Sequence, residues 1–352
     1  MQPIQRIALS PGTLALILCV LVVCLWTFWG VAEMFHEGWY APFEWLFYLL
    51  PAGTSLALTL IALTWPRAGG WMLIGAGVVF YAWALFSTAA RVGLNLWTAM
   101  SWLPVSGLLA VVGVIFLRAA RGSDPLFDAD SRWWRRHLRY LIAIGAPLLV
   151  GLGTAAGPAM RVARRVDDGN YGARLIQGNG VTLIWAPAGP GWQRDITWNE
   201  IALYGLPPVG FDGKALGRDG RCTPTVSDGC ASAADMQQFN VCRYLSDDGL
   251  RLETTVQGYW RMPSTDDVVR SLVTQGEHAG CAWTGRTGRQ PCATPPDKET
   301  PLWNPGSPII YLWTAGEAGP SEAYDVTYNG AVRAMPKFTA LGSQGYRCVR
   351  TP

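Results

Sequence analysis

Long apolar runs fill the first half of the chain and are absent from the second half. Five segments, each of about 20 residues and without a charged side chain, have the length that an α-helix needs to cross the hydrocarbon core of a bilayer. These segments are Thr13 to Ala32, Trp45 to Trp65, Trp71 to Ala90, Leu96 to Leu117 and Tyr140 to Met160. The pattern predicts a membrane α-helical bundle of five transmembrane helices over residues 1–160.

After Met160 the chain becomes rich in Gly, Pro, Asp, Thr and Cys, and no later apolar run is long enough to span a bilayer. We therefore expect a linker at residues 161–172 and an aqueous domain at residues 173–352. In the whole chain 50% of the residues are hydrophobic and 15% are charged, which is more apolar than an ordinary soluble protein of this length. Composition thus supports the division that the pattern makes.

Shorter patterns within residues 173–352 predict an α+β domain. Two apolar-rich runs, Arg174–Gln177 and Val181–Trp185, flank Gly178-Asn179-Gly180, which is a turn signal typical of a β-hairpin. Further strands are expected at Ile309–Trp313, Ala323–Tyr328 and Ala331–Ala334, the last two joined by an Asn-Gly turn.

Two helices are expected between these strands. From Ala231 to Ser246, apolar side chains recur at helical spacing and would turn Cys242 toward the core. A second helix should begin at Ser264, because Asp267 follows three residues later, as in a capping box, and an apolar face comes after it.

Arginine placement predicts the orientation in the membrane. Short loops on the cytoplasmic side of multi-pass proteins carry an excess of Lys and Arg. One side of the predicted spans carries Arg6, Arg67, Arg118, Arg121, Arg132, Arg135, Arg136 and Arg139. Loops of the opposite parity carry only Arg91, and the cluster before the fifth span outweighs Arg161, Arg164 and Arg165 after it. We therefore expect an inner-membrane protein with residues 173–352 periplasmic or extracellular, partnered by the lipid bilayer. The net charge of +3 is mostly cytoplasmic arginine, so it gives no sign of nucleic-acid binding.

Cysteine usage is an independent indication of the compartment. Cys19 and Cys24 lie inside the first predicted span. The other six lie in the predicted exterior domain, which is typical of disulfides formed outside the cytoplasm: Cys222, Cys230, Cys242, Cys281, Cys292 and Cys348. Since there is no Cys-x-x-Cys pair and His is scarce, we expect neither a zinc site nor another metal or cofactor.

Few side chains of the exterior domain suggest catalysis. The domain has no Gly-x-Ser-x-Gly motif, and His278 is its single histidine, beside Glu277 in a Gly-rich stretch. The favoured interpretation of His278 is a solvated histidine in a loop. The alternative is a functional role, in which Glu277 and His278 are the candidate ligand-binding residues.

One polar cluster marks the outer end of the first span. Glu33, His36 and Glu37 would share a helical face if the helix continues that far, and such a face can bind a cation. An interfacial cluster beside Trp39 and Tyr40 is the favoured alternative. Since no predicted span carries a charge at its centre, the spans are expected to act as an anchor, an assembly surface or a lipid-facing module rather than as an ion-coupled transporter.

Four short runs of the exterior domain together resemble a known family. They are Cys242-Arg243-Tyr244-Leu245, Tyr259-Trp260-Arg261-Met262-Pro263-Ser264, Ile310-Tyr311-Leu312-Trp313-Thr314 and Tyr346-Arg347-Cys348-Val349-Arg350. They look like the Lcl C-terminal-type domain, which is similar to the formylglycine-generating-enzyme and C-type-lectin-like group of folds. The resemblance covers residues 173–352 and implies a C-type-lectin-like scaffold, with a glycan or another envelope component as a possible ligand.

The most specific part of this resemblance is a Trp-Arg-Leu-Pro-Thr signature, present here as Trp260 to Ser264 with Met262 and Ser264 replacing Leu and Thr. A Trp, an Arg and a rigid Pro at a helix entrance suit a core aromatic, an ion pair and a fixed chain direction. We expect Trp260, Arg261, Pro263 and Ser264 to maintain the fold. A sugar-stacking role for Trp260 is the alternative.

The resemblance also implies a disulfide pattern. Lectin-like folds commonly tie their first helix to their final strand, which implies a Cys242–Cys348 bond and leaves two local pairs, Cys222–Cys230 and Cys281–Cys292. The formylglycine-generating relatives use two neighbouring cysteines near the C-terminus, whereas this chain has only Cys348 after Cys292. A membrane-anchored binding or adhesion module is therefore the favoured function, and an enzyme of another type on the same scaffold is the alternative.

Overall fold

The computed structural model describes residues 10–37, 44–92, 96–122, 124, 126–127, 133–194, 196–206, 209–211, 222, 229–340 and 343–352. Several residues used in the predictions above lie outside these ranges, namely Arg6, Trp39, Tyr40 and Arg132, and so do the side chains of Arg91, Arg135 and Arg136. The chain divides into two compact units, one of Met1–His36 with Phe43–Ala159 and one of Glu37–Pro42 with Met160–Pro352.

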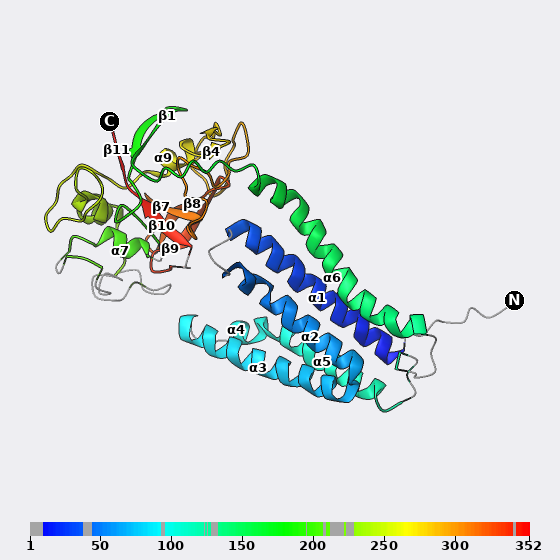
Figure 1. Ribbon diagram of the computed structural model, residues 1–352. Helices are drawn as coiled ribbons and strands as arrows, with labels where there is room; N and C mark the ends of the chain where they lie inside the picture. The colour runs from blue at the N-terminus through cyan, green and yellow to red at the C-terminus, as the bar shows by residue number, and fades with distance from the viewer. Residues whose placement is uncertain are drawn as a thin grey trace. The chain divides into compact units, whose positions relative to one another are not determined.

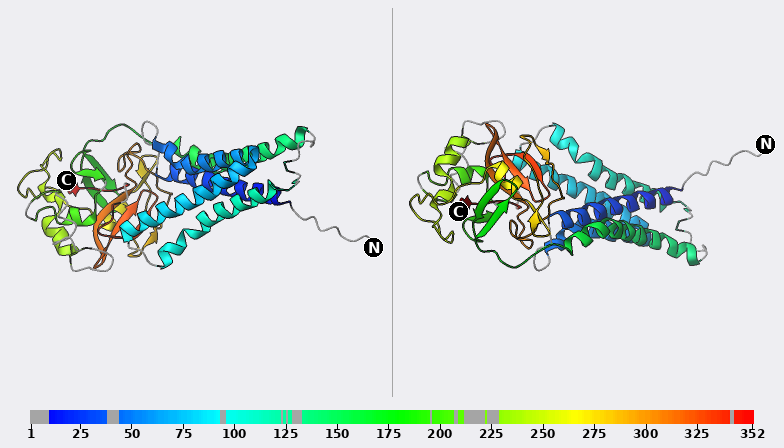
Figure 2. Two further views of the ribbon diagram at one scale, coloured as in Figure 1. Left: turned by 90° about the horizontal axis from the view of Figure 1, so that it is seen from below. Right: turned by 90° about the horizontal axis from the view of Figure 1, so that it is seen from above.

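The first unit is helical, and its long helices run side by side (Figures 1 and 2). Its elements are α1 (Pro11–Glu37), η1 (Glu44–Leu49), α2 (Leu50–Thr64), α3 (Pro66–Val92), α4 (Leu96–Ser101), α5 (Leu103–Ala119) and α6 (Trp133–Val162). Four of the described helical stretches are long and apolar enough to cross a membrane: Pro11–Glu37, Leu46–Thr64, Pro66–Thr88 and His137–Val162. They coincide with four of the five predicted spans.

The remaining predicted span, Leu96 to Leu117, is divided into two helices. α4 ends at Ser101 and α5, a shorter apolar helix, begins at Leu103. The cause is Pro104, which has no N–H to donate to the carbonyl four residues earlier. Trp102 between the helices keeps a near-helical backbone, with φ −90° and ψ −14°. The chain direction is therefore maintained across the break.

Small residues let α3 and α5 approach closely. A Cβ added to Gly70 would lie 2.9 Å from the carbonyl oxygen of Gly113, and one added to Gly113 would lie 2.5 Å from the carbonyl oxygen of Gly70. Close backbone contact through glycine is typical of helix pairs in membranes, where burying apolar surface gives no advantage over contact with lipid. Large apolar side chains such as Phe86 and Trp97 are instead exposed, as expected for lipid-facing positions.

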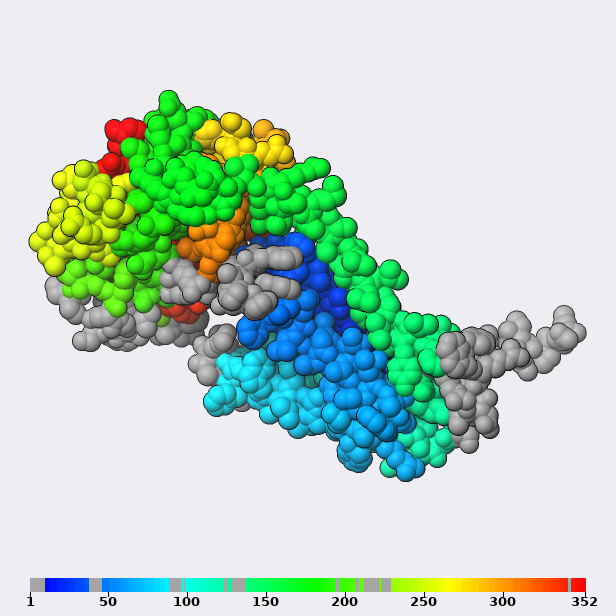
Figure 3. Space-filling view, viewed as in Figure 1, coloured from blue at the N-terminus to red at the C-terminus, as the bar shows by residue number. Residues whose placement is uncertain are grey.

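The second unit consists mostly of β-sheet. A three-stranded sheet has the order β1 (Arg174–Gly178), β2 (Val181–Trp185), β11 (Val349–Arg350). In the space-filling view the red C-terminal residues accordingly lie beside the green residues of the hairpin (Figure 3). The six-stranded sheet has the order β3 (Trp192–Arg194), β10 (Gln344–Arg347), β7 (Tyr311–Gly319), β8 (Glu322–Thr327), β9 (Ala331–Pro336), β6 (Gly288–Arg289). β4 (Val273–Thr274) and β5 (Glu277–His278) form a separate pair.

Short helices connect these strands: α7 (Trp198–Ala202), α8 (Ala233–Phe239), η2 (Val241–Tyr244) and α9 (Thr265–Arg270). The start predicted at Ser264 is confirmed, because the Ser264 side chain accepts from the Asp267 N–H and the Asp267 carboxylate accepts from the Ser264 N–H. The single helix predicted from Ala231 to Ser246 is wrong. Asn240, with φ −58° and ψ 152°, ends α8, and its side-chain amide donates to the Met236 carbonyl in place of helical bonding.

Two clusters of buried side chains form the core of the second unit. One gathers around Trp185, Trp303 and Val326, and the other around Trp198, Trp260 and Trp313. Three disulfides link described cysteines, and all three expected pairs are confirmed: Cys222–Cys230, Cys242–Cys348 and Cys281–Cys292. The disulfides indicate that the second unit lies in an oxidising compartment outside the cytoplasm. The apolar helices of the first unit indicate a membrane protein.

Candidate functional site

Trp260 anchors the signature segment in the core. It is only 2% exposed, and its indole N–H donates to the Ser246 carbonyl at 2.8 Å. The Arg350 guanidinium stacks on the ring at 4.7 Å from the centroid. Since neither ring face is open to solvent, Trp260 has the environment of a structural residue.

Arg261 and Ser264 fix the direction of this segment. The backbone of Arg261 exchanges two hydrogen bonds with Val349, while its guanidinium, on a side chain that is 47% exposed, pairs with Asp267 at 2.7 Å. Burial acts to raise the pKa of Asp267, but hydrogen bonds from Arg261 and from the backbone N–H of Ser264 outweigh it and lower that pKa below its ordinary value. Pro263 contributes its carbonyl, which accepts from the Ala315 N–H at 2.7 Å. The signature thus joins the start of α9 to strands β7 and β11.

A cavity opens beside this segment, and we call it the signature cavity. Its volume is about 300 Å³. The lining residues come from α8, η2, the signature segment and the residues next to them: Met236, Gln237, Asn240, Arg243, Gly258, Trp260, Arg261 and Met262. The buried members form the floor, and the exposed or half-exposed members form the mouth. Cavities of this size are at the small end of the range for ligand pockets.

Polar groups in the signature cavity have incomplete hydrogen bonding. Asn240 is 3% exposed, and within the described part of the chain its side-chain oxygen accepts no hydrogen bond. Arg243 donates from one terminal nitrogen to the carbonyls of Gln237 and Gln238, both at 3.0 Å. No ion pair between described residues involves Arg243, so its charge is uncompensated there.

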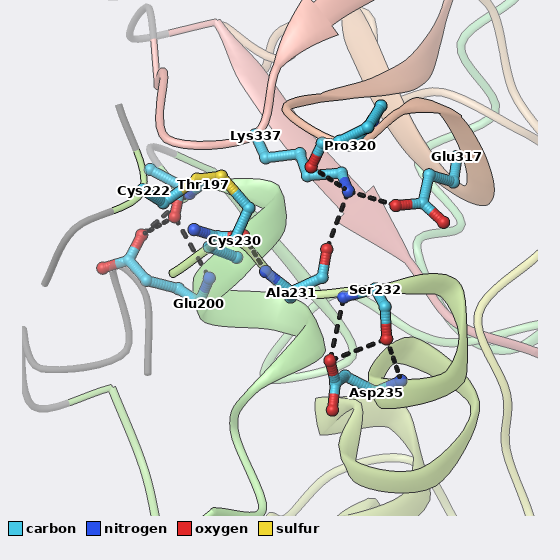
Figure 4. Close-up of a disulfide and its surroundings, with 11 residues drawn as sticks. Thr197, Glu200, Cys222, Cys230, Ala231, Ser232, Asp235, Glu317, Pro320 and Lys337 are labelled. Carbon is cyan, nitrogen blue, oxygen red and sulfur yellow. Dashed lines mark hydrogen bonds and ion pairs between the residues drawn. A yellow bond between two sulfur atoms is a disulfide. The ribbon is translucent and has the colours of Figure 1, made fainter. Parts of the chain in front are cut away.

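A second hollow, of about 470 Å³, is lined by residues 230–232 and 317–320. Figure 4 shows the neighbouring Cys222–Cys230 bond and the contacts of Lys337. Lys337 is fully buried, and its ammonium donates to the carbonyls of Ala231 and Pro320 and to the Glu317 carboxylate. These three acceptors use all three N–H groups of the ammonium. Lys337 therefore links three chain segments through hydrogen bonds and has no N–H group left to donate to a ligand.

Glu277 and His278 lie apart from both hollows. They form β5, where the imidazole Nε2 of His278 lies 2.8 Å from the Gln177 carbonyl oxygen and the ring is half-buried. The loop placement expected for His278 is wrong, because it lies in β5 paired with β4, and its contact with the Gln177 carbonyl places it against the first hairpin. Neither Glu277 nor His278 lines the signature cavity.

A buried cation, Arg347, is a further feature that sequence reasoning passed over. Its guanidinium lies 3.9 Å from the ring centroid of Trp192 and donates to the carbonyls of Ala186, Pro301 and Leu302. Burial first, and then repulsion by Arg174, lower the pKa of Arg347 to about 9. Its contacts are to backbone and to an aromatic ring within the core, so its role is structural.

Helix α1 does continue to Glu37, as the predicted polar face at Glu33, His36 and Glu37 requires. Within the described ranges, however, no group of three or more His, Cys, Asp or Glu side chains is arranged to hold a metal ion. Among the described residues, the signature cavity is therefore a candidate site in which partly used polar groups line a concave space.

Comparison of the chain with protein-family models, with curated proteins and with solved structures found no match. Functional inference for this protein consequently depends on the chemistry of the signature cavity and on the membrane-anchored, disulfide-bonded organisation of the chain.

Proposed function

We propose that this protein is a membrane-anchored binding or adhesion module, displayed outside the cytoplasm on a lectin-like scaffold, whose ligand is a glycan or another component of the cell envelope. The observation that carries the proposal is the signature cavity. It combines an apolar floor with two polar side chains, Asn240 and Arg243, whose hydrogen-bonding groups the described structure uses only in part, and this is the usual composition of a small-ligand pocket.

The proposal includes five membrane spans with the N-terminus in the cytoplasm. Support for a fifth span comes from α4 and α5, which follow one another with one near-helical residue between them. Support for the orientation comes from the arginine distribution and from the disulfides. A reporter enzyme that is active only outside the cytoplasm should be active when fused after Pro352 and inactive when fused near Asp128, which lies outside the described residues. The reverse pattern would overturn the orientation.

Binding is best tested with the full chain in lipid nanodiscs against arrays of glycans and envelope-derived peptides. Gln237 is exposed and lines the signature cavity, so Gln237→Trp should fill the mouth without disturbing the core. Gln238 is exposed on the same helix but does not line the cavity, which makes Gln238→Trp the matched control. We expect the first variant to lose at least tenfold in affinity and the second to bind as the wild type does. Equal binding by both variants would remove the cavity from the proposal.

A further inference from the structure

We infer that the signature cavity captures the C-terminal residue of a peptide, recognising its carboxylate, its amide N–H and an apolar side chain together. This inference rests on the proposed function and specifies the ligand class of the same site. Three separate properties of the cavity correspond to the three groups of a peptide terminus, and each follows from described residues.

The first property is a positive charge without a partner. Arg261 at the mouth is paired with Asp267, but the side chain of Arg243 donates only to two backbone carbonyls among the described residues. A guanidinium has five N–H groups in a planar fork, and Arg243 uses one terminal nitrogen for both bonds. The rest of the fork is therefore open to a carboxylate, which guanidinium binds in a two-pronged manner.

The second property is an acceptor that the fold leaves unused. Asn240 ends α8 and donates from its side-chain amide to the Met236 carbonyl. Its side-chain oxygen is buried without a donor in the described structure, and an unpaired buried acceptor is unfavourable. Because the oxygen itself is fully buried, a ligand N–H reaches it when the Asn240 side chain turns toward the cavity, and the hydrogen bond then formed removes that cost. Asn240, between α8 and η2, and Arg243, in η2, are three residues apart and both line the signature cavity, so an acceptor and a cation meet there.

The third property is an apolar floor of Met236, Trp260 and Met262, each at most 3% exposed. Thioether side chains adapt to different apolar shapes, which suits a pocket for a Leu-, Met- or Phe-like group. The same floor argues against a sugar. Stacking of a sugar ring needs an open aromatic face, whereas Trp260 is buried and covered by Arg350. The C-terminal residue of a peptide has a group that matches each of the three properties. Other proteins are known to capture C-terminal carboxylates.

The test uses the full wild-type chain in nanodiscs and N-acetylated tripeptides ending in leucine, methionine or phenylalanine. Each peptide is prepared as the free acid, as the C-terminal amide, and as the free acid methylated on the last peptide nitrogen. We expect the amide to bind at least tenfold more weakly than the acid, because it cannot pair with a guanidinium. We expect the methylated peptide to bind at least fivefold more weakly, because it has no N–H for Asn240.

A variant then assigns the carboxylate contact. Arg243→Gln should weaken binding of the acid at least tenfold and abolish the difference between acid and amide. Arg289, an exposed arginine on β6 outside the cavity lining, provides the control Arg289→Gln, which should retain that difference. A thermal denaturation scan of each variant checks that it folds.

Three outcomes would overturn the inference. Equal binding of acid and amide by the wild type would show that no carboxylate is recognised. Binding of uronic-acid oligosaccharides, but not of the peptides, in a manner blocked by Gln237→Trp would overturn the peptide class while leaving the proposed function in place. Binding of neither class would overturn the peptide inference, and binding insensitive to Gln237→Trp would remove the signature cavity from both proposals.

Discussion

Removing the Cys242–Cys348 bond should destabilise the second unit more than removing either local disulfide. The bond spans 106 residues of sequence, and in the chain-entropy model a loop of that length contributes about 4.8 kcal/mol at 25 °C. The same relation gives about 2.6 kcal/mol for Cys222–Cys230, with a separation of 8, and about 2.8 kcal/mol for Cys281–Cys292, with a separation of 11. Both cysteines of the long bond are also fully buried, so small voids left by alanine add a cost of the same sign.

Three double variants test this ranking, each with both cysteines of one pair changed to alanine. The full chain in nanodiscs is treated with urea, and a short protease pulse measures the fraction of the second unit that remains folded. We expect the urea midpoint to fall most for the Cys242/Cys348 variant, by a free energy about 2 kcal/mol larger than for the other two. Non-reducing peptide mapping of the wild type confirms the pairs beforehand. Equal losses in the three variants, or a larger loss for a local pair, would refute the reasoning.

Three further predictions concern buried side chains. Trp260→Ala should lower the free energy of unfolding by about 3–5 kcal/mol in the same urea assay, and unchanged stability with lost ligand binding would make Trp260 a ligand-contacting residue instead. Glu317→Gln should cost about 3 kcal/mol because it leaves the buried Lys337 ammonium without its carboxylate, and adding Lys337→Met should recover most of that loss. Burial, with repulsion by Arg165, lowers the pKa of Lys298 to about 7. The unfolded chain therefore binds more protons above pH 7, so stability should rise between pH 7 and 9, and Lys298→Met should flatten that rise.

Local turn chemistry predicted one hairpin accurately and another with a shift. Asn179 and Gly180, with φ of 49° and 80°, form the two-residue turn that joins β1 and β2, because both positions tolerate the left-handed region. The later Asn329-Gly330 sequence predicts the same turn, but there the loop has three residues and β8 ends at Thr327. Gly330, with φ 84°, occupies the last of them. A one-residue difference in register changes every cross-strand pair.

That difference in register has a structural consequence. Asp325, fully buried, lies opposite Arg333, whose guanidinium binds both of its carboxylate oxygens and stacks on the Tyr311 ring at 3.5 Å. A two-residue turn would place Asp325 opposite Ala334 and leave a buried carboxylate without this partner. The preference of the Asn-Gly pair is small compared with the cost of an unpaired buried charge, so tertiary pairing determines the turn. Local turn propensity does not include the cost of an unpaired buried charge, so it could not predict this register.

The signature cavity could not be predicted from the sequence, because it too depends on tertiary structure. Its motif residues are visible in the sequence, but the polar groups that give it chemistry depend on a helix that ends early at Asn240. In an uninterrupted helix from Ala231 to Ser246, the backbone N–H and C=O groups of this region would hydrogen-bond one another, and Arg243 would lie in an ordinary helical turn. Lys337 was missed because its partners Ala231, Glu317 and Pro320 are separated widely in sequence. Such sites exist only after the chain segments have packed.

Structure and binding are coupled within the signature segment itself. Trp260 and Met262 point inward and are buried, whereas Arg261 between them is half exposed, which is the alternation of an extended chain paired with Val349. Substitution of either inward residue therefore alters the core and the cavity floor together, and loss of binding alone cannot identify a ligand contact. The mouth residues Gln237 and Arg243 separate the two effects, because both extend outward from the core. A ligand bound there should stabilise the second unit by about 2.7 kcal/mol at a hundred times its dissociation constant. The urea midpoint of the wild-type chain should consequently rise on adding a peptide that binds, and the same concentration of the corresponding amide should stabilise the unit by at most about 1.4 kcal/mol, because it binds at least tenfold more weakly.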